Sequence, residues 1–545
     1  MSMPHGDTAS IRDIVKSIED GDYRIPRFQR DFVWEIKKSA ALIDSIFRGY
    51  PIGSVILWKT KSKLSCVEQK DLGGIKIKGK ETGRYTSYII DGQQRLTSLF
   101  MAVKGFTSGK GQDFSKICVS LTATGDNQIV FDDIPKDEDP DDYISLKDLY
   151  AGSVKGKYHE QKMNYFTILQ QYNISVIELD DDDIGLEQVV EIFERLNLGG
   201  KKLNMFSIMA ARSYFPTTDT DEGFDLAQKL DGLNKKLKDT NYGTITDATF
   251  LQVIAACLIG KNKKSEILKK LDAQQIRDNY DEIEKAIFEA IEHLKGKEYG
   301  AVVSALLPYE RLIVPFAYFH FYQKRKQITK FQEKYLVDYF WRCVLTKRFN
   351  NAADANTDAD LPRIQTILKG KQPTQERIEL SPKSIFENGR FILSSGYVLG
   401  LLCLMAQRNP QSLSAGTRVE ITNAAISKSA KKQYHHFFPK QSKVILNNKE
   451  YKNVVNNIIN IVFMDSRTNN QIKNMNPSKY IVKFSKNSSR FSSVLKSHYI
   501  ERKGFGIEND DFFQFLNARS NALFTQLNKY IIKSKSDSIT NELPF

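Results

Sequence analysis

The sequence lacks the closely spaced cysteines that organise small secreted folds and zinc ribbons. Its five cysteines, Cys66, Cys118, Cys257, Cys343 and Cys403, stand far apart. No two of them have the spacing of a redox motif or a metal-binding knuckle. Neither a disulfide framework nor a cysteine-ligated zinc ion is therefore expected.

Long hydrophobic runs are also absent. No stretch approaches the roughly 18 consecutive apolar residues of a membrane span. The N-terminal sequence, MSMPHGDTASIRDIVKSIEDG, is polar and then amphipathic, without the apolar core of a signal peptide. The sequence thus predicts a cytoplasmic protein with no membrane partner.

Positive charge is plentiful but unevenly placed. The chain of 545 residues carries a formal net charge of +14. Residues 426–503 contain 16 Lys or Arg against 3 Asp or Glu, so this segment supplies nearly all of the excess. Localised positive charge favours a polyanionic partner, because binding displaces counterions from phosphates. The alternative is a basic, solvated surface without a partner.

The chain length favours two to four domains. Residues 1–214 mix strand and helix patterns, residues 215–410 are mostly helical, and residues 411–545 hold the basic segment and a closing amphipathic helix. A stretch rich in Ser, Thr and Ala, at 409–432, resembles a linker with one short element. In the first 180 residues, helices are expected near 10–20 and 35–48, and strands near 52–58, 115–121 and 171–179.

Some residues that look like sites are expected to be structural. The four aspartates at 180–183 precede a helical pattern, where acids suit the helix dipole, and consecutive residues cannot all converge on one ion. The acidic stretch at 132–142 is typical of a solvated loop. His293 and His320 lie singly in helical patterns and are expected to be structural.

The stretch SYIIDGQQRLTSLFMAVKG, at 87–105, places a polar turn between a strand pattern and a helix pattern. A helix start offers unpaired N–H groups to an anion. In this turn Gly92 permits close approach, Arg95 supplies a fork of donors, and Gln93 and Gln94 add neutral donors and acceptors. Asp91 could bind magnesium or position Arg95. In the alternative, purely structural interpretation, Asp91 caps the helix and Arg95 pairs with it.

Four motifs follow one another in the first domain: I-P-x-x-Q-R-x-x-x-W at 25–34, IDSIFRGYPIGSVILW at 43–58, IIDGQQRLTSL at 89–99 and FERLNLGGKKLN at 193–204. This series resembles the N-terminal domain of the GmrSD family, which comprises modification-dependent (type IV) restriction enzymes and related phage-defence proteins. The resemblance implies a ParB/sulfiredoxin-like fold that binds a nucleoside triphosphate. The residues implied to line the nucleotide pocket are Asp91, Gly92, Gln93, Gln94, Arg95, Gln29, Arg30, Asn197, Gly199 and Gly200.

A second cluster, QYHHFFPK at 433–440, lies inside the basic segment. Neighbouring side chains of a strand point to opposite faces, so two adjacent histidines would not normally bind one ion together. In a bent strand and loop, one can ligate a metal while the other activates water. A structural turn is the alternative. Asn460 follows downstream, and Asn469 lies nine residues after it.

This spacing resembles the ββα-metal, or HNH, nuclease motif, and the trailing NPSKY agrees with the nuclease domain attached to GmrSD-type N-terminal domains. The resemblance implies that His436 is the general base and His435 a metal ligand, where many relatives have Asp. Asn460 would orient the catalytic loop or His436, and Asn469 would complete the metal site. Asn470 competes with Asn469, because it begins an N-x-x-K sequence.

The sequence therefore predicts an α+β multidomain protein with a ParB/sulfiredoxin-like domain, an α-helical middle and an HNH nuclease domain with a closing helix. The expected function is a nucleotide-regulated DNA endonuclease of phage defence that uses Mg²⁺ or Mn²⁺ and acts on foreign or modified DNA. Lys431, Lys432, Lys440 and Lys473 are expected to contact the DNA. NTPase activity and homodimer formation stay open. The rival functions are a nucleotide-gated DNA-binding protein with a degenerate nuclease domain, and an RNase.

Overall fold

The structure is a computed structural model. It describes residues 5–26, 32–60, 85–109, 111–124, 127–180, 188, 189, 192, 195, 205–214, 223–240, 242–426, 433–486 and 490–545. The chain forms two compact units, Met1–Ala227 and Gln228–Phe545. The second unit contains both the helical middle and the basic segment, so the predicted division into three domains stays a prediction.

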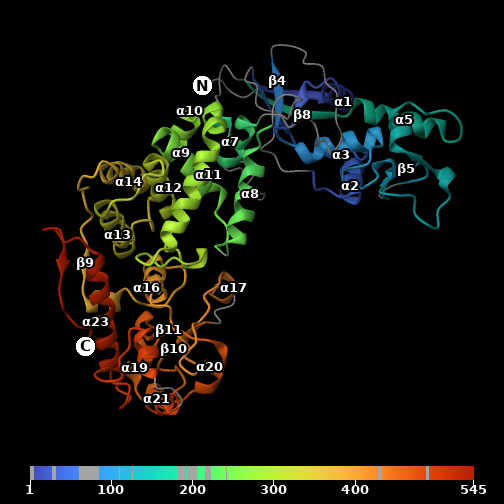
Figure 1. The fold of residues 1–545 in the computed structure, drawn as a ribbon. Helices are drawn as coiled ribbons and strands as arrows, with labels where there is room; N and C mark the ends of the chain where they lie inside the picture. The colour runs from blue at the N-terminus through green and yellow to red at the C-terminus, as the bar shows by residue number, and fades with distance from the viewer. Residues whose placement is uncertain are drawn as a thin grey trace. The chain divides into compact units, whose positions relative to one another are not determined.

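The first unit is built on a mixed five-stranded sheet, seen among the blue and teal elements of Figure 1. Its strands are β1 (His5–Ser10), β2 (Tyr23–Arg24), β3 (Val55–Thr60), β4 (Thr86–Asp91) and β8 (Asn173–Asp180). In the order β1-β8-β3-β4-β2, β1 is antiparallel to β8 and β3 to β4, whereas β3 and β8, like β2 and β4, run parallel. Because β4 lies between β3 and β2, the turn after it begins within the sheet.

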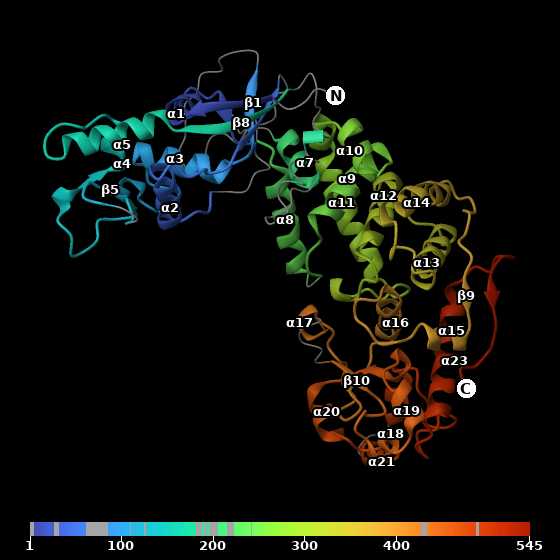
Figure 2. The same ribbon diagram turned by 180° about the vertical axis from the view of Figure 1, so that it is seen from behind.

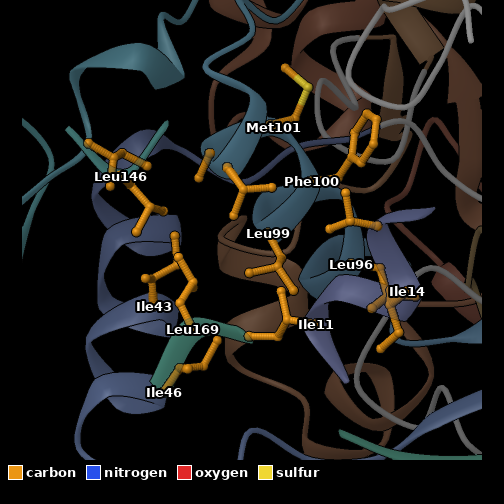
Figure 3. Close-up of a cluster of buried hydrophobic side chains, with 14 of the residues drawn as sticks. Ile11, Ile14, Ile43, Ile46, Leu96, Leu99, Phe100, Met101, Leu146 and Leu169 are labelled. Carbon is orange, nitrogen blue, oxygen red and sulfur yellow. The ribbon is translucent and has the colours of Figure 1, made fainter. Parts of the chain in front are cut away.

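Helices bury their apolar sides in one core of this unit (Figure 3). They are α1 (Ile11–Glu19), α2 (Ile36–Phe47), α3 (Gln93–Lys104), α4 (Leu146–Tyr150) and α5 (His159–Gln171). The predicted first helix is confirmed. The Ser10 side chain caps α1 by accepting from the Asp13 N–H at 3.1 Å, and Ile11, Ile14, Val15 and Ile18 are all buried. Each such apolar side chain contributes about 1.5–3 kcal/mol on burial.

A smaller sheet, in the order β6-β5-β7, packs beside α2. Its strands are β5 (Cys118–Ser120), β6 (Val130–Phe131) and β7 (Tyr143–Ser145), and the unit also contains α7 (Met205–Ser213). The Asp44 carboxylate of α2 accepts from the N–H groups of Ile129 at 2.7 Å and Val130 at 3.0 Å. The acidic stretch 132–142 is largely exposed, as expected of a solvated loop.

The second unit begins with helices, as the sequence predicts. They are α8 (Leu226–Asp239), α9 (Asp247–Ile259), α10 (Lys264–Lys270), α11 (Ala273–Lys295), α12 (Ile313–Gln323), α13 (Lys330–Leu345), α14 (Ala353–Leu368), α15 (Pro382–Glu387) and α16 (Gly396–Ala406). The largely buried helix α12 packs against α9, α11 and α14. The mixture of a helical region with sheet-containing regions confirms the predicted α+β multidomain class.

The two histidines expected to be isolated in fact touch each other. His293 Nδ1 of α11 lies 3.0 Å from His320 Nε2 of α12, and His293 Nε2 lies 2.9 Å from Glu333 Oε2 of α13. The Tyr299 hydroxyl donates to the other Glu333 oxygen at 3.0 Å. Burial lowers the pKa of His320 to about 4. These contacts join three helices, which agrees with a structural role.

The basic segment forms short elements closed by a long helix. They are α17 (Asn423–Ile426), β10 (Tyr434–His436), α18 (Lys443–Leu446), α19 (Lys449–Val454), β11 (Ile461–Phe463), α20 (Ser466–Ile472), α21 (Pro477–Ser485), α22 (Phe491–Lys496) and α23 (Phe512–Tyr530). Near the C-terminus, β12 (Ser538–Ile539) pairs in parallel with β9 (Glu379–Leu380). Figure 2 shows β10, α19, α20 and α21 gathered in this part of the second unit.

The interpretation of 409–432 as a linker is wrong for its first half. Ser412 and Leu413 are buried, and Gln411 forms a bridge with Arg418. The Ser412 hydroxyl lies 2.9 Å from that of Thr468 in α20. Small hydroxyl side chains pack here against a helix instead of staying in solvent. Residues 427–432 lie outside the described part of the chain.

The described cysteines, Cys118, Cys257, Cys343 and Cys403, are buried free thiols, as the absence of close pairs predicts. Across the described ranges, no helix combines the length and the apolar character needed to cross a bilayer.

Candidate functional site

The polar turn of the first unit connects β4 to α3 through a left-handed glycine. Gly92 has φ 92° and is the N-cap residue of α3, where it provides no side-chain cap. A Cβ atom at Gly92 would lie 3.1 Å from Val55 Cγ2, so both the backbone angle and the space favour glycine. Gly92 therefore brings no capping side chain of its own to the start of α3.

Arg95 braces the turn against the loop before β3. Its Nη2 lies 2.9 Å from Asp91 Oδ2, and its Nη1 donates to the Ile52 carbonyl at 2.8 Å. A Cβ atom at Gly53 would lie 2.4 Å from Arg95 Nη1, so the guanidinium runs directly over this glycine. The pairing of Arg95 with Asp91 agrees with the structural interpretation, but Asp91 does not cap the helix. The Arg95 side chain keeps 21% of its exposure.

The two glutamines of the turn face the protein more than the solvent. Gln93 and Gln94 are 5% and 7% exposed, and Gln94 Oε1 accepts from the Val33 N–H at 3.0 Å. Gln94 thus links α3 to Val33, which lies in the described end of the IPRFQRDFVW motif. Gln29, Arg30, Asn197, Gly199 and Gly200 lie outside the described residues.

The HHFFP cluster lies on an antiparallel strand pair that a helix follows. His435 of β10 is opposite Val462 of β11, and His436 is opposite Ile461. Only Met464 and Asp465 separate β11 from α20, and Asp465 caps that helix by accepting from the Thr468 N–H at 2.8 Å. Along the chain, the short helices α18 and α19 lie between the paired strands β10 and β11, and α20 follows β11; Figure 1 shows β10, β11 and α20 in the same part of the second unit. The histidines are on β10 and Asn469 is on α20.

His436 is half-buried, and the Asn456 side chain contacts its ring. Its Nε2 lies 3.3 Å from Asn456 Oδ1. Burial lowers the pKa of His436 to about 4, the charge of Lys440 acts in the same direction, and the hydrogen bond to Asn456 opposes them. At neutral pH the imidazole is therefore uncharged and can accept a proton, as a general base must.

Asn460 is fully buried and holds the loop that follows the histidines. Its Oδ1 accepts from the Phe438 N–H at 2.8 Å, and its Nδ2 donates to the carbonyls of Phe438 at 3.1 Å and Val455 at 3.0 Å. Its own carbonyl accepts from the Phe437 N–H at 2.8 Å. These contacts agree with the expectation that Asn460 orients the loop, and its burial keeps it away from a substrate.

Both candidate asparagines lie on α20, with different exposure. Asn469 is half-buried, whereas Asn470 is exposed. The half-buried position of Asn469 suits a ligand held against the protein better than that of Asn470. His435 is also half-buried. The described residues contain no group of three or more His, Cys, Asp or Glu that could hold a metal ion.

Lys440 and Lys473 are exposed near this site. Lys440 follows the HHFFP loop, and Lys473 ends α20 with a positive φ of 49°. Lys431 and Lys432 lie outside the described residues.

Sequence reasoning missed two residues that support the strand pair. The Tyr480 hydroxyl donates to the Phe437 carbonyl at 2.6 Å, which gives a structural role to the NPSKY motif. Arg519 of α23 is fully buried and donates to the carbonyls of Ile459 and Ile461, the latter at 2.7 Å, on either side of Asn460. Arg519 lies among apolar residues of an amphipathic helix, and this exception to the pattern could have revealed it.

Most of the first unit matches a known protein family. Residues 11–214 match the family model of the GmrSD restriction endonuclease N-terminal domain. The match supports a relationship to GmrSD-like restriction endonucleases, in agreement with the four motifs. It ends before the basic segment begins.

A second comparison extends over nearly the whole chain. The protein is 24% identical over 582 residues to the uncharacterized protein MJ0686 of Methanocaldococcus jannaschii. The alignment covers 93% of this chain and 94% of that protein. The similarity to this protein therefore extends beyond residues 11–214 and into the second unit.

Proposed function

We propose that this protein is a nucleotide-regulated, metal-dependent DNA endonuclease of the HNH type that acts in phage defence on foreign or modified DNA. The GmrSD match of the first unit supports a restriction role, and with it DNA as the partner. The observation that carries the nuclease assignment is the frame around His436. A strand pair and a helix hold His435, His436 and Asn469, and buried Asn460 fixes the loop between them.

In this mechanism His436 accepts the proton of the attacking water. Its imidazole is neutral at pH 7, and Asn460 and Tyr480 fix the backbone directly after it. Hydrogen bonds to a loop backbone keep the base in place without contact to the substrate. Loss of this geometry would slow proton transfer even in a folded protein.

The residues present fit a divalent cation that retains water ligands. His435 supplies a ring nitrogen and Asn469 an amide oxygen, with no cluster of three His, Cys, Asp or Glu nearby in the described chain. Such a small protein ligand set leaves positions for water and for phosphate oxygen, as Mg²⁺ sites usually do. The cation would supply positive charge against the phosphate. A histidine in place of aspartate makes the donor set softer, which shifts the metal preference from Mg²⁺ toward Mn²⁺.

The nucleotide site is proposed at the turn after β4. The support is the left-handed Gly92 at the start of α3, where the helix dipole favours an anion, together with the partly exposed Arg95 guanidinium. A triphosphate would bind at the start of α3 and take the place of Asp91 at Arg95. Asp91 would then be available for the magnesium ion of the nucleotide. Nucleotide hydrolysis is not required for such a sensor.

The test uses the full chain with plasmid and phage DNA, both modified and unmodified, and with RNA of similar length. Each substrate is incubated with Mg²⁺ or Mn²⁺, alone and with ATP, GTP, CTP or UTP. The proposal expects metal-dependent DNA cleavage that changes with one or more nucleotides. Binding without cleavage under all conditions would favour the degenerate-nuclease alternative, and cleavage of RNA alone would favour an RNase.

A further inference from the structure

Asn456 makes the side-chain contact to the His436 ring. Its Oδ1 lies 3.3 Å from His436 Nε2, and both side chains are half-buried. An amide oxygen can only accept a hydrogen bond. The contact therefore requires a proton on Nε2, so that the neutral ring carries its lone pair on Nδ1.

The contact of the Asn456 amide nitrogen supports this orientation of the side-chain amide. Its Nδ2 points to the Phe391 carbonyl at 3.5 Å, and a carbonyl can only accept. Turning the amide over would place two acceptors against each other at Phe391 and would turn the Asn456 NH₂ toward the ring. The arrangement in the structure is the one that satisfies both neighbours.

The backbone around Asn456 is bound to a segment outside the strand pair. The Phe391 N–H donates to the Asn456 carbonyl at 2.9 Å, and the Ile458 N–H donates to the Gly389 carbonyl at 2.7 Å. A Cβ atom at Gly389 would lie 2.7 Å from Asn457 Oδ1, so the two segments approach as closely as glycine allows. Asn456 is thus held by a fixed backbone, as a group that orients another side chain must be.

We propose that Asn456 is the positioning residue of the general base. It holds the His436 imidazole in the Nε2–H tautomer and presents Nδ1 to the attacking water. This inference rests on the proposed nuclease function. The water proton passes to Nδ1 as the water oxygen bonds to phosphorus, the bond from phosphorus to the leaving sugar oxygen breaks, and that oxygen takes a proton from solvent. The hydrogen bond from Nε2–H to Asn456 strengthens as the ring becomes positive.

The experiment compares two substitutions of similar shape. Asn456→Leu removes the acceptor, whereas Asn456→Asp keeps an oxygen there, and both remove the Nδ2 donor. Asn456→Leu should lower the cleavage rate at saturating DNA by roughly 10–100-fold, the usual effect of losing such a supporting contact. Asn456→Asp should restore most of that rate. The DNA dissociation constant and the melting temperature should stay close to wild type in both.

A matched control is Asn453→Leu, because Asn453 is an exposed residue of α19. It should cleave as wild type does. The inference is overturned if Asn456→Leu cleaves at the wild-type rate, or if Asn456→Asp is as slow as Asn456→Leu. A loss of rate explained by unfolding would appear in the melting temperature, and the tautomer measurement below then decides.

A second readout does not depend on activity. NMR spectra of metal-free protein with ring-¹³C-labelled histidine report the tautomer, and His436→Ala identifies the signal. Wild type and Asn456→Asp should show the Nε2–H form, and Asn456→Leu should lose that preference. An Nδ1–H form in the wild type overturns the inference. If the wild type cuts no DNA, or if His436→Ala cuts normally, the proposed function fails, while the tautomer result still shows whether Asn456 fixes the ring proton.

Discussion

The two candidate sites are each braced by an arginine, and the two arginines differ in one decisive way. Arg95 at the N-terminal turn pairs with Asp91, and its side chain keeps 21% of its exposure. Arg519 of α23 is fully buried and donates to the backbone carbonyls of His498 and Ile461. Burial lowers the pKa of Arg519 to about 9, so it is still charged at neutral pH.

The difference in burial decides whether the partner of each arginine could be replaced by a ligand. The proposed nucleotide would replace Asp91 at Arg95, and the released carboxylate, which is 39% exposed, could then be solvated. No ligand can replace the carbonyls at Arg519 without leaving buried acceptors unpaired. The turn therefore suits a switchable sensor, and the frame around His436 suits chemistry that needs fixed geometry.

The largest expected effect concerns the chemistry of the second region. His436→Ala should slow DNA cleavage by about 10²–10⁴-fold, because a general base is lost. DNA binding and the melting temperature should change little, since the ring is not a core group. The measurement is single-turnover cleavage at saturating DNA, with a gel-shift titration as control. Cleavage at the wild-type rate would refute the HNH assignment.

The next effect compares the two braces directly. Arg519→Met should lower the free energy of unfolding by about 2–4 kcal/mol, because carbonyls at Ile459, Ile461 and His498 lose their donor. Arg95→Met should cost at most about 1 kcal/mol, as is usual for a partly exposed ion pair. Chemical unfolding of both variants measures this. Equal losses would remove the distinction between a fixed and an exchangeable brace.

Low pH should reduce the free energy of unfolding through the buried side chain of His498. Burial lowers the pKa of His498 to about 4, and His498 Nε2 donates to the Gln411 carbonyl at 2.7 Å. In the unfolded chain this pKa is about 6.5. Between about pH 6.5 and pH 4 the unfolded state binds a proton that the folded state does not, so stability is full above this window and falls as the pH is lowered through it.

The matching variant is His498→Gln, which keeps an amide donor for Gln411 but does not titrate. Its loss of unfolding free energy between about pH 7 and pH 4 should be smaller than that of wild type by up to roughly 3 kcal/mol. Denaturant unfolding at several pH values measures this difference. Parallel pH curves for the two proteins would mean that His498 is not the source.

A smaller effect tests the exchangeable brace. Arg95→Ala should weaken nucleotide affinity by about tenfold to a hundredfold, the value of one charge-assisted hydrogen bond. Thermal melts with and without each nucleoside triphosphate and magnesium measure it. If no nucleotide shifts the wild-type melting temperature, the turn is structural. Arg95 and Arg519 would then differ only in how much each stabilises the fold.

The smallest effect concerns the DNA surface. Lys440→Gln and Lys473→Gln should each reduce the salt dependence of DNA binding by about 0.9 log unit per log unit of salt, if each lysine contacts one phosphate. Lys116→Gln is a control, because Lys116 is an exposed lysine of the first unit, paired with Asp133 at 2.9 Å. A change in slope for Lys116→Gln and none for the other two would place the DNA surface elsewhere.

Several features followed from the sequence alone, because they depend on local patterns. The Ser10 cap and the apolar spacing of Ile11, Ile14 and Ile18 predicted α1 correctly. The glycine between a strand and a helix pattern predicted the turn after β4. The resemblance to the HNH motif implied that Asn460 orients the catalytic loop or His436, and its hydrogen bonds to Phe438 agree with the first of these. The catalytic and metal-binding roles stay predictions.

The tertiary structure alone decided which distant residues support each site. Asn456 and Tyr480 meet the HHFFP strand and loop only after folding, and Arg519 meets the Ile461 carbonyl of the paired strand. Ile52 and Gly53 meet Arg95 in the same way. Sequence periodicity shows which face of a helix or strand is buried, but not which backbone carbonyl a buried polar group will reach. Such a group must find a partner when it leaves water, and the partner is set by the packing of elements that lie far apart along the chain.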